Sequence, residues 1–161
     1  MGKNKEINVR VADFQVAKGD VVLVTNGLGS CVGLALYDAN AQVAGLAHIL
    51  LDSSKRAKTE VNKAKFADTA VGLLLKEMED LGANRKNVRA KIVGGSKVMF
   101  TDNEKASMGE RNVKAVKKAL KESKIPIISE DTGGKTGRTM YLFADGKVKV
   151  KLTGKNDIRE I

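Results

Sequence analysis

The stretch VGLALYDANAQVAGLAHIL, residues 32–50, decides the fold of this chain. Two apolar runs flank Asp38-Ala39-Asn40-Ala41, a segment whose residue types favour a turn. The pattern predicts a β-hairpin with strands over 32–37 and 42–50. Because antiparallel pairing joins the first residues of one strand to the last residues of the next, we expect Cys31 and His48 near the open end of this hairpin.

The only cysteine and the only histidine of the chain are therefore expected side by side. Cys31 ends the segment Thr25-Asn26-Gly27-Leu28-Gly29-Ser30-Cys31, which follows a short apolar run that predicts a buried strand over 21–24. Small residues let the backbone turn sharply and approach a bound group closely. A thiol beside an imidazole is a pair used in nucleophilic catalysis.

Both residues also have a structural interpretation. Free cysteine is among the most buried residue types, so Cys31 could be a core thiol. A core thiol needs no turn around it, whereas a nucleophile gains from an exposed turn with free backbone N–H groups that can hold an oxyanion. His48 could donate to a backbone carbonyl in the core, but both faces of its strand are apolar and its imidazole needs a partner.

Three neighbours complete the candidate site. Thr25 could orient the imidazole as the third member of a triad, or it could be an ordinary β-branched strand residue. Ser30, beside Gly29, is a candidate oxyanion or turn residue. We do not expect Ser30 to be the nucleophile, because a thiol ionises far more readily than a hydroxyl near neutral pH.

The rest of the chain predicts more strands than helices. An apolar face over 66–81 followed by Gly82 indicates one helix, and a capping box beginning at Ser107 announces a second. Further extended segments are expected over 7–11, 88–93, 125–128, 138–143 and 147–152, and a polar loop over 52–62. These elements predict an α+β protein with mixed β-sheets in a single domain spanning residues 1–161.

Composition limits the function classes. The chain has 161 residues, a net charge of +10 and one cysteine, so no internal disulfide is possible and a soluble protein of the reducing cytoplasm is expected. The basic charge favours anionic partners, but two tyrosines, four phenylalanines and no tryptophan offer few surfaces for stacking bases. One histidine and one cysteine give two soft ligands where a structural zinc site needs four, so no metal or cofactor is expected.

Several segments together resemble the CheD family of chemoreceptor glutamine deamidases. The segments 25–32 and 45–51 are similar to the two active-site blocks of that family. Further matching blocks follow in the family's order: Phe66-Ala67-Asp68, Lys91-Ile92-Val93-Gly94-Gly95, Met108-Gly109-Glu110-Arg111-Asn112 and Asp131-Thr132-Gly133-Gly134-Lys135-Thr136-Gly137-Arg138.

The resemblance implies a triad of Cys31, His48 and Thr25 in a two-layer β core flanked by helices, an α/β/β/α-like arrangement similar to the cysteine hydrolase domain of deamidating toxins. It also implies conversion of specific glutamines of methyl-accepting chemotaxis receptors into glutamate, with release of ammonia through a cysteine thioester. The chemotaxis phosphatase CheC is the implied partner, with no nucleic acid and no membrane insertion. A non-catalytic chemotaxis adaptor and a basic nucleic-acid-binding module remain the alternatives.

Overall fold

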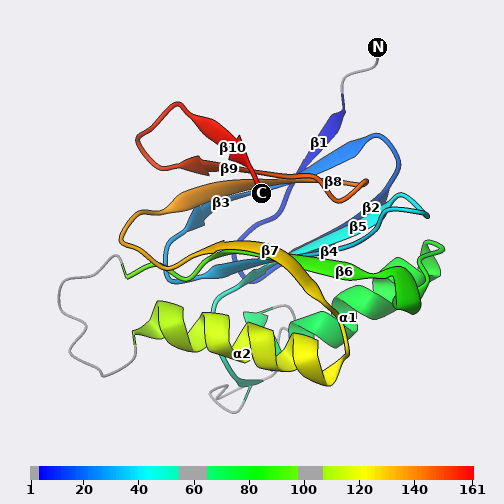
Figure 1. Cartoon of the computed structure of the whole chain (residues 1–161), viewed down its shortest axis with the longest axis horizontal. Coiled ribbons are helices and arrows are strands. Elements are labelled where there is room, and N and C mark those ends of the chain that lie inside the picture. Colours follow the sequence, from blue (N-terminus) through cyan, green and yellow to red (C-terminus); the bar gives the residue numbers. More distant parts are fainter. Residues whose placement is uncertain (1–3, 55–64, 98–106) are drawn as a thin grey trace.

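The computed structural model describes residues 4–54, 65–97 and 107–161, which form two five-stranded sheets and two α-helices (Figure 1). The first sheet has the order β1-β3-β8-β9-β10, with bounds Lys5–Asn8, Val21–Leu28, Arg138–Phe143, Val148–Leu152 and Ile158–Glu160. The second has the order β2-β5-β4-β6-β7, with bounds Phe14–Lys18, Val43–Ile49, Val32–Asp38, Arg89–Gly94 and Ile127–Thr132. Each sheet contains parallel and antiparallel pairs, which confirms the predicted α+β class with mixed sheets.

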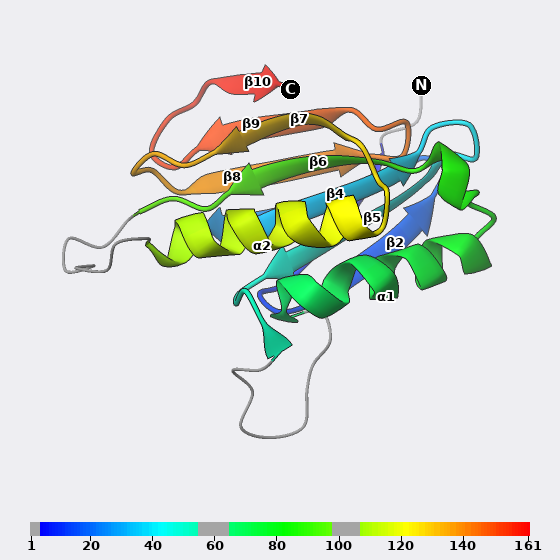
Figure 2. The same cartoon turned by 60° about the horizontal axis from the view of Figure 1, so that its bottom comes forward.

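The two sheets stack face to face, and both helices lie on the outer face of the second sheet (Figure 2). Helix α1 spans Ala67–Asp80 and packs on β5 and β2, while α2 spans Met108–Glu122 and packs on β4 and β6. A 3-10 turn over Arg85–Asn87 connects α1 to β6. Among the described residues the layers therefore run sheet, sheet, helices. The helices flank the β core on one side only, not on both sides as the expected α/β/β/α-like arrangement has them, because α1 and α2 both pack on the second sheet (Figure 2).

Two hydrophobic cores result from these layers. One lies between the second sheet and the helices and includes Leu34, Ile49 and Leu74. The other lies between the sheets and includes Leu46, Met140 and Cys31. Strands β4 and β5 are buried along their whole length because each contributes side chains to both cores.

The hairpin predicted from residues 32–50 is confirmed. Strands β4 and β5 pair antiparallel, with Val32 opposite Ile49 and Gly33 opposite His48. Since successive side chains of a strand point to opposite faces, this register places His48 on the face of Leu46, toward the first sheet. The register thus aims the imidazole into the space between the two sheets.

Other predictions need adjustment. Strand β2 was not predicted, because its short sequence carries no strand pattern of its own. It is extended because it pairs with β5. Strand β10 was also missed, because all three of its residues are exposed and no alternation of apolar and polar residues marks it. The loop predicted over 52–62 lies largely outside the described residues. Within the described part of the chain, no helix is long and apolar enough to cross a membrane.

Candidate active site

A hydrogen-bonded chain joins the two sheets at the site. Thr25 Oγ1, on β3 of the first sheet, lies 2.7 Å from His48 Nδ1, on β5 of the second. The same hydroxyl donates to the carbonyl oxygen of Val9 at 2.8 Å. Thr25 and His48 are both fully buried, at 0% exposure, so neither bond competes with solvent.

This arrangement determines where the imidazole carries its proton. A hydroxyl has one proton, and the Val9 carbonyl can only accept, so the proton of Thr25 points to Val9. Thr25 Oγ1 must then accept from His48 Nδ1–H. In the neutral ring this assigns the proton to Nδ1 and leaves a lone pair on Nε2.

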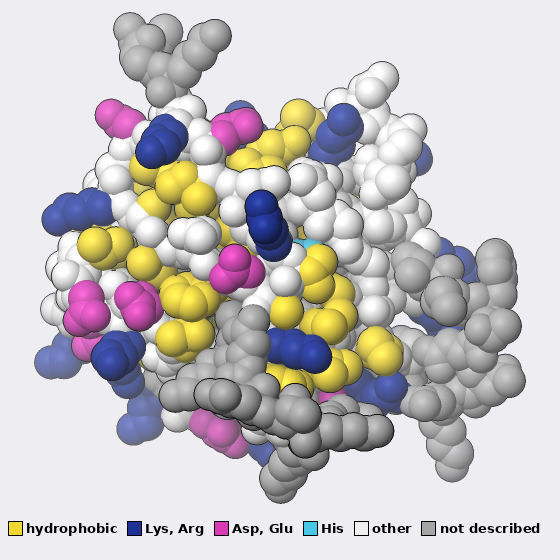
Figure 3. Space-filling view, turned by 180° about the vertical axis from the view of Figure 1, so that it is seen from behind, with side chains coloured by type: hydrophobic (Ala, Val, Ile, Leu, Met, Phe, Trp, Pro, Cys, Tyr) yellow, Lys and Arg dark blue, Asp and Glu magenta, His cyan; other side chains and the backbone are white. Residues whose placement is uncertain are grey.

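The lone pair on His48 Nε2 is free to act as a base. Nε2 is buried and has no hydrogen-bond partner among the residues that the structure describes. Burial lowers the pKa of His48 from 6.5 to about 4, so the ring is neutral at pH 7. In Figure 3 the histidine side chain, coloured cyan, is only just visible between the atoms around it.

Cys31 lies diagonally across the hairpin from His48. It immediately precedes β4, one pair beyond the Val32–Ile49 pair, and it belongs to the core between the sheets. In antiparallel pairs, diagonal neighbours lie about 7–8 Å apart and within reach of each other's side chains. Gly33, the residue of β4 opposite His48, carries no side chain, and Met140 and Leu28 fill the space that a Cβ would take there.

The thiol is more enclosed than the exposed turn expected from the sequence. Cys31 is 8% exposed, and burial raises the pKa of its thiol. Strand β6 packs closely on the backbone of this residue, since a Cβ at Gly94 would collide with the carbonyl oxygen of Cys31. In the resting site the thiol and the imidazole are thus both neutral, and no hydrogen bond joins Sγ to Nε2.

The turn before Cys31 is held by its carbonyl groups. Gly29 O accepts from Ser96 N at 2.8 Å, Ser30 O from Asn112 Nδ2 at 2.9 Å, and Cys31 O from Gly95 N at 2.8 Å. No backbone N–H of Ser30 or Cys31 donates to another residue in the described part of the chain. The carbonyls of the turn are thus tethered, and the N–H groups of Ser30 and Cys31 are candidate donors to a ligand.

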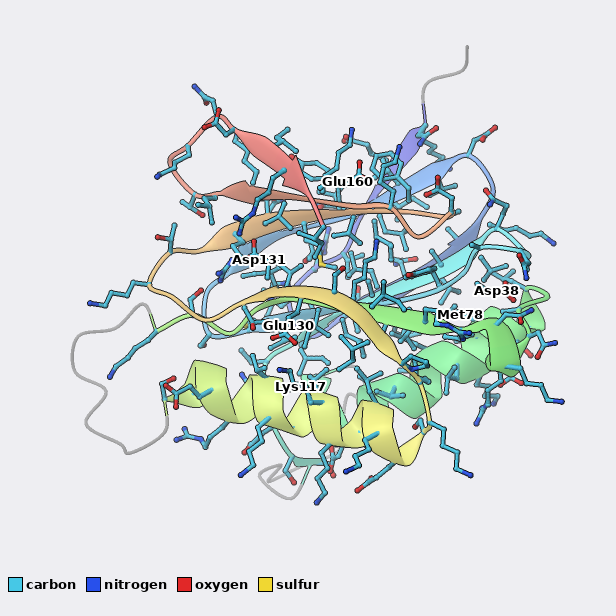
Figure 4. The ribbon with its side chains drawn as sticks, in the orientation of Figure 1. Asp38, Met78, Lys117, Glu130, Asp131 and Glu160 are labelled. Atoms are coloured by element: carbon cyan, nitrogen blue, oxygen red, sulfur yellow. The ribbon has the colours of Figure 1, made fainter. Side chains whose placement is uncertain are left out.

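A buried ion pair supports the segment that holds the turn. Arg138 on β8 donates to Ser96 Oγ at 2.7 Å and pairs with Asp131 on β7 at 3.3 Å. Asp131 also forms an ion pair with Arg159 of β10, at 2.6 Å, so this carboxylate joins the edges of both sheets (Figure 4). The contacts fix the position of Ser96, whose N–H binds Gly29.

The structure brings Thr25 and His48 into contact, and sequence reasoning missed other residues of the site. Thr25 and His48 are bonded, Cys31 lies on the same face, and Gly29 and Ser30 form the turn. Sequence reasoning did not find the acceptor at Val9, whose contribution is a backbone carbonyl. It also missed Asn112, although a polar residue four positions before the apolar Val116 was a detectable signal. Among the described residues no group of three potential metal ligands occurs.

The fold and the site define an α+β protein in which a cysteine, a histidine and a threonine gather between two mixed sheets. Over residues 49–152 the chain matches the family described as CheD chemotactic sensory transduction. Together with relatives that are far more than 30% identical over nearly the whole chain, this match shows that the chain belongs to the CheD family.

Relatives span the chain almost from end to end. A probable chemoreceptor glutamine deamidase CheD of Clostridium kluyveri is 47% identical over 161 residues, covering 98% of both chains. Proteins of the same description from Clostridium botulinum Eklund 17B and Caldanaerobacter subterraneus are 47% and 44% identical, each covering 94% of this chain and 96% of its own. A solved structure, hypothetical protein YfiH of Bacillus licheniformis, is 13% identical with a TM-score of 0.41, covering 78% of this chain and 59% of its own.

Proposed function

We propose that this chain is a protein-glutamine deamidase that converts glutamine side chains of chemotaxis receptors into glutamate and ammonia. The observation that supports it most directly is the state of His48. Its Nδ1 is bonded to Thr25, and its buried, unprotonated Nε2 has no partner among the described residues and lies on the face that Cys31 shares. A base that is held in one tautomer beside a thiol is the requirement for a cysteine nucleophile. The names of the relatives supply the substrate class.

In the first half of the reaction the thiol becomes acylated. Cys31 Sγ transfers its proton to His48 Nε2, and the thiolate adds to the side-chain carboxamide carbon of a receptor glutamine. The backbone N–H groups of Ser30 and Cys31 are the candidate donors to the resulting oxyanion, each worth about 3 kcal/mol in comparable sites. His48 Nε2–H then protonates the departing nitrogen, the C–N bond breaks, and ammonia leaves a thioester on Cys31.

In the second half the thioester is hydrolysed. His48 Nε2 takes a proton from water as the oxygen adds to the thioester carbon. The tetrahedral intermediate collapses, the C–S bond breaks, and the sulfur recovers its proton from the imidazolium. The products are a glutamate side chain and the resting thiol. Thr25 keeps Nδ1–H oriented throughout, so Nε2 alone exchanges protons.

The resting geometry is compatible with a substrate-dependent step. Sγ and Nε2 are not hydrogen-bonded before substrate arrives, and catalytic hydrogen bonds commonly tighten only in the complex. A neutral thiol also protects the free enzyme from oxidation, because the thiolate is the reactive form. The glutamine carboxamide would complete the contact between the two residues.

The direct test is mass spectrometry of a purified receptor fragment before and after incubation with the protein. We expect selected glutamines to become glutamates and an equal amount of ammonia to be released, with neither change produced by Cys31→Ala. Deamidation by Cys31→Ala at the wild-type rate would refute the mechanism. Unchanged glutamines with the wild-type protein, on a fragment that a known deamidase of this family modifies, would refute the function.

We further infer that the protein acts in the cytoplasm and binds the phosphatase CheC rather than nucleic acid. The inference rests on the family resemblance, on a single cysteine that forms no internal disulfide and on the scarcity of aromatic side chains. Calorimetric titration with purified CheC tests it, and DNA at low and at physiological salt is the control titration. Binding to DNA that persists at physiological salt, with no heat from CheC, would favour the nucleic-acid alternative.

A further inference from the structure

Helix α2 buries a polar side chain where its sequence pattern calls for an apolar one. Asn112, Val116 and Leu120 recur every four residues and form the inner face of the helix. Val116 and Leu120 pack into the core, and Asn112 is 1% exposed. Burying an amide costs free energy unless its polar atoms are bonded, so this position requires an explanation beyond packing.

The amide of Asn112 bridges the two segments that carry the candidate nucleophile and base. Its Nδ2 donates one hydrogen to Ser30 O at 2.9 Å and the other to Leu50 O at 3.1 Å. Ser30 immediately precedes Cys31, and Leu50 lies two residues after His48. A single planar group thus spans the open end of the β4–β5 hairpin, where the ladder of the two strands has ended.

The orientation of this amide is unambiguous. Both acceptors are backbone carbonyl oxygens, so a flipped amide would face two oxygens with its own oxygen. The Oδ1 atom that results is buried and has no partner in the described part of the structure. An unsatisfied buried acceptor costs about 1–3 kcal/mol, a cost that a side chain selected for stability alone would not carry.

We propose that Asn112 is a positioning residue that holds the Cys31 turn at a fixed distance from the His48 strand. This inference rests on the proposed function. The backbone ladder constrains the two strands only as far as its last pair, Val32 with Ile49, and both Cys31 and Leu50 lie one position beyond it. Gly95 N and Ser96 N hold the turn to β6, but neither contacts the strand of His48. Among the described residues, Asn112 donates hydrogen bonds to both segments.

The test uses alkylation of Cys31 by iodoacetamide as a function of pH, which needs no receptor. In the wild type we expect a component of the rate that rises as His48 loses its proton near pH 4 and stays level through neutral pH, because the neutral Nε2 takes the thiol proton as iodoacetamide alkylates the sulfur. His48→Ala should lack that component. Asn112→Ala should lack it too and react only at alkaline pH, where the thiol ionises unaided.

A second variant separates positioning from stability. Val116→Ala removes buried volume from the same face of α2, one turn away, and does not touch the turn. It should lose stability yet keep the neutral-pH component. With a receptor fragment, Asn112→Ala should lower kcat about 100-fold with little change in KM, as a displacement of about 1 Å does elsewhere. If Asn112→Ala does not fold, Asn112→Ser, which keeps one donor, takes its place with a smaller loss expected.

Each outcome decides between the claims. A wild type without the neutral-pH component overturns the Cys31–His48 pair, and with it the proposed function and this inference. A wild type with the component and an Asn112→Ala variant that retains it overturns only the role of Asn112. Loss of the component in Val116→Ala as well would make the effect one of general stability and would also overturn the positioning role.

Discussion

The hydroxyl of Thr25 offers the sharpest test of the site, because two substitutions separate the effect of its oxygen from the effect of its methyl group. Thr25→Val keeps the volume of the fully buried side chain and removes Oγ1. Both the Val9 carbonyl and His48 Nδ1–H then lose their partner. Thr25→Ser does the reverse, since it keeps the oxygen and removes a methyl group.

The magnitude follows from the two bonds. A buried polar group left without a partner costs about 1–3 kcal/mol, so the two groups together should lower the free energy of unfolding by about 2–6 kcal/mol in Thr25→Val. The part of this free energy that comes from the bond to His48 Nδ1–H also favours the tautomer in which Nε2 is unprotonated. Its loss corresponds to a decrease in kcat of about 5- to 150-fold.

The assay measures ammonia release from a receptor fragment. It is run at a temperature at which both variants are folded, as judged from their chemical denaturation curves. We expect Thr25→Ser to retain most of the wild-type kcat and Thr25→Val to lose it to the extent given above. Equal activity of folded Thr25→Val and wild type would refute the orienting role. A Thr25→Ser variant as inactive as Thr25→Val would show that the methyl group, rather than the hydrogen bond, matters.

Further predictions concern the nucleophile, the base and the turn. Cys31→Ala should abolish ammonia release and leave the circular dichroism spectrum unchanged; residual turnover would contradict covalent catalysis. The pKa of His48 falls from 6.5 in the unfolded chain to about 4 in the folded protein, so the unfolded state takes up a proton first as the pH is lowered. The free energy of unfolding should therefore decrease by roughly 3 kcal/mol between pH 6.5 and pH 4. His48→Gln should flatten this part of the plot of unfolding free energy against pH, and an unchanged slope would contradict the assignment. Gly94→Ala should destabilise the protein more than Gly154→Ala. Both glycines have positive φ, but only at Gly94 would a Cβ meet the carbonyl oxygen of Cys31. If both variants lose the same unfolding free energy, backbone strain alone is responsible.

Much of the fold could be read from local patterns. The hairpin over 32–50, the helix ending before Gly82 and the hairpin around Asp145-Gly146 all follow from signals within a few residues. The Ser107 cap is also confirmed, with its hydroxyl accepting from Glu110 N at 3.1 Å. The strands that escaped prediction, β2 and β10, owe their conformation to the partner strand beside them.

The sequence by itself determined which chemistry is available and which hairpin brings Cys31 toward His48. Only the tertiary structure decided that Thr25 reaches Nδ1 across the gap between two sheets, that the Val9 carbonyl takes its proton, and that Asn112 bridges Ser30 and Leu50. The physical reason is the distance along the sequence over which each interaction is determined. Alternation along a strand and the residues of a turn are local properties, whereas bonds between stacked layers depend on how whole sheets and helices pack.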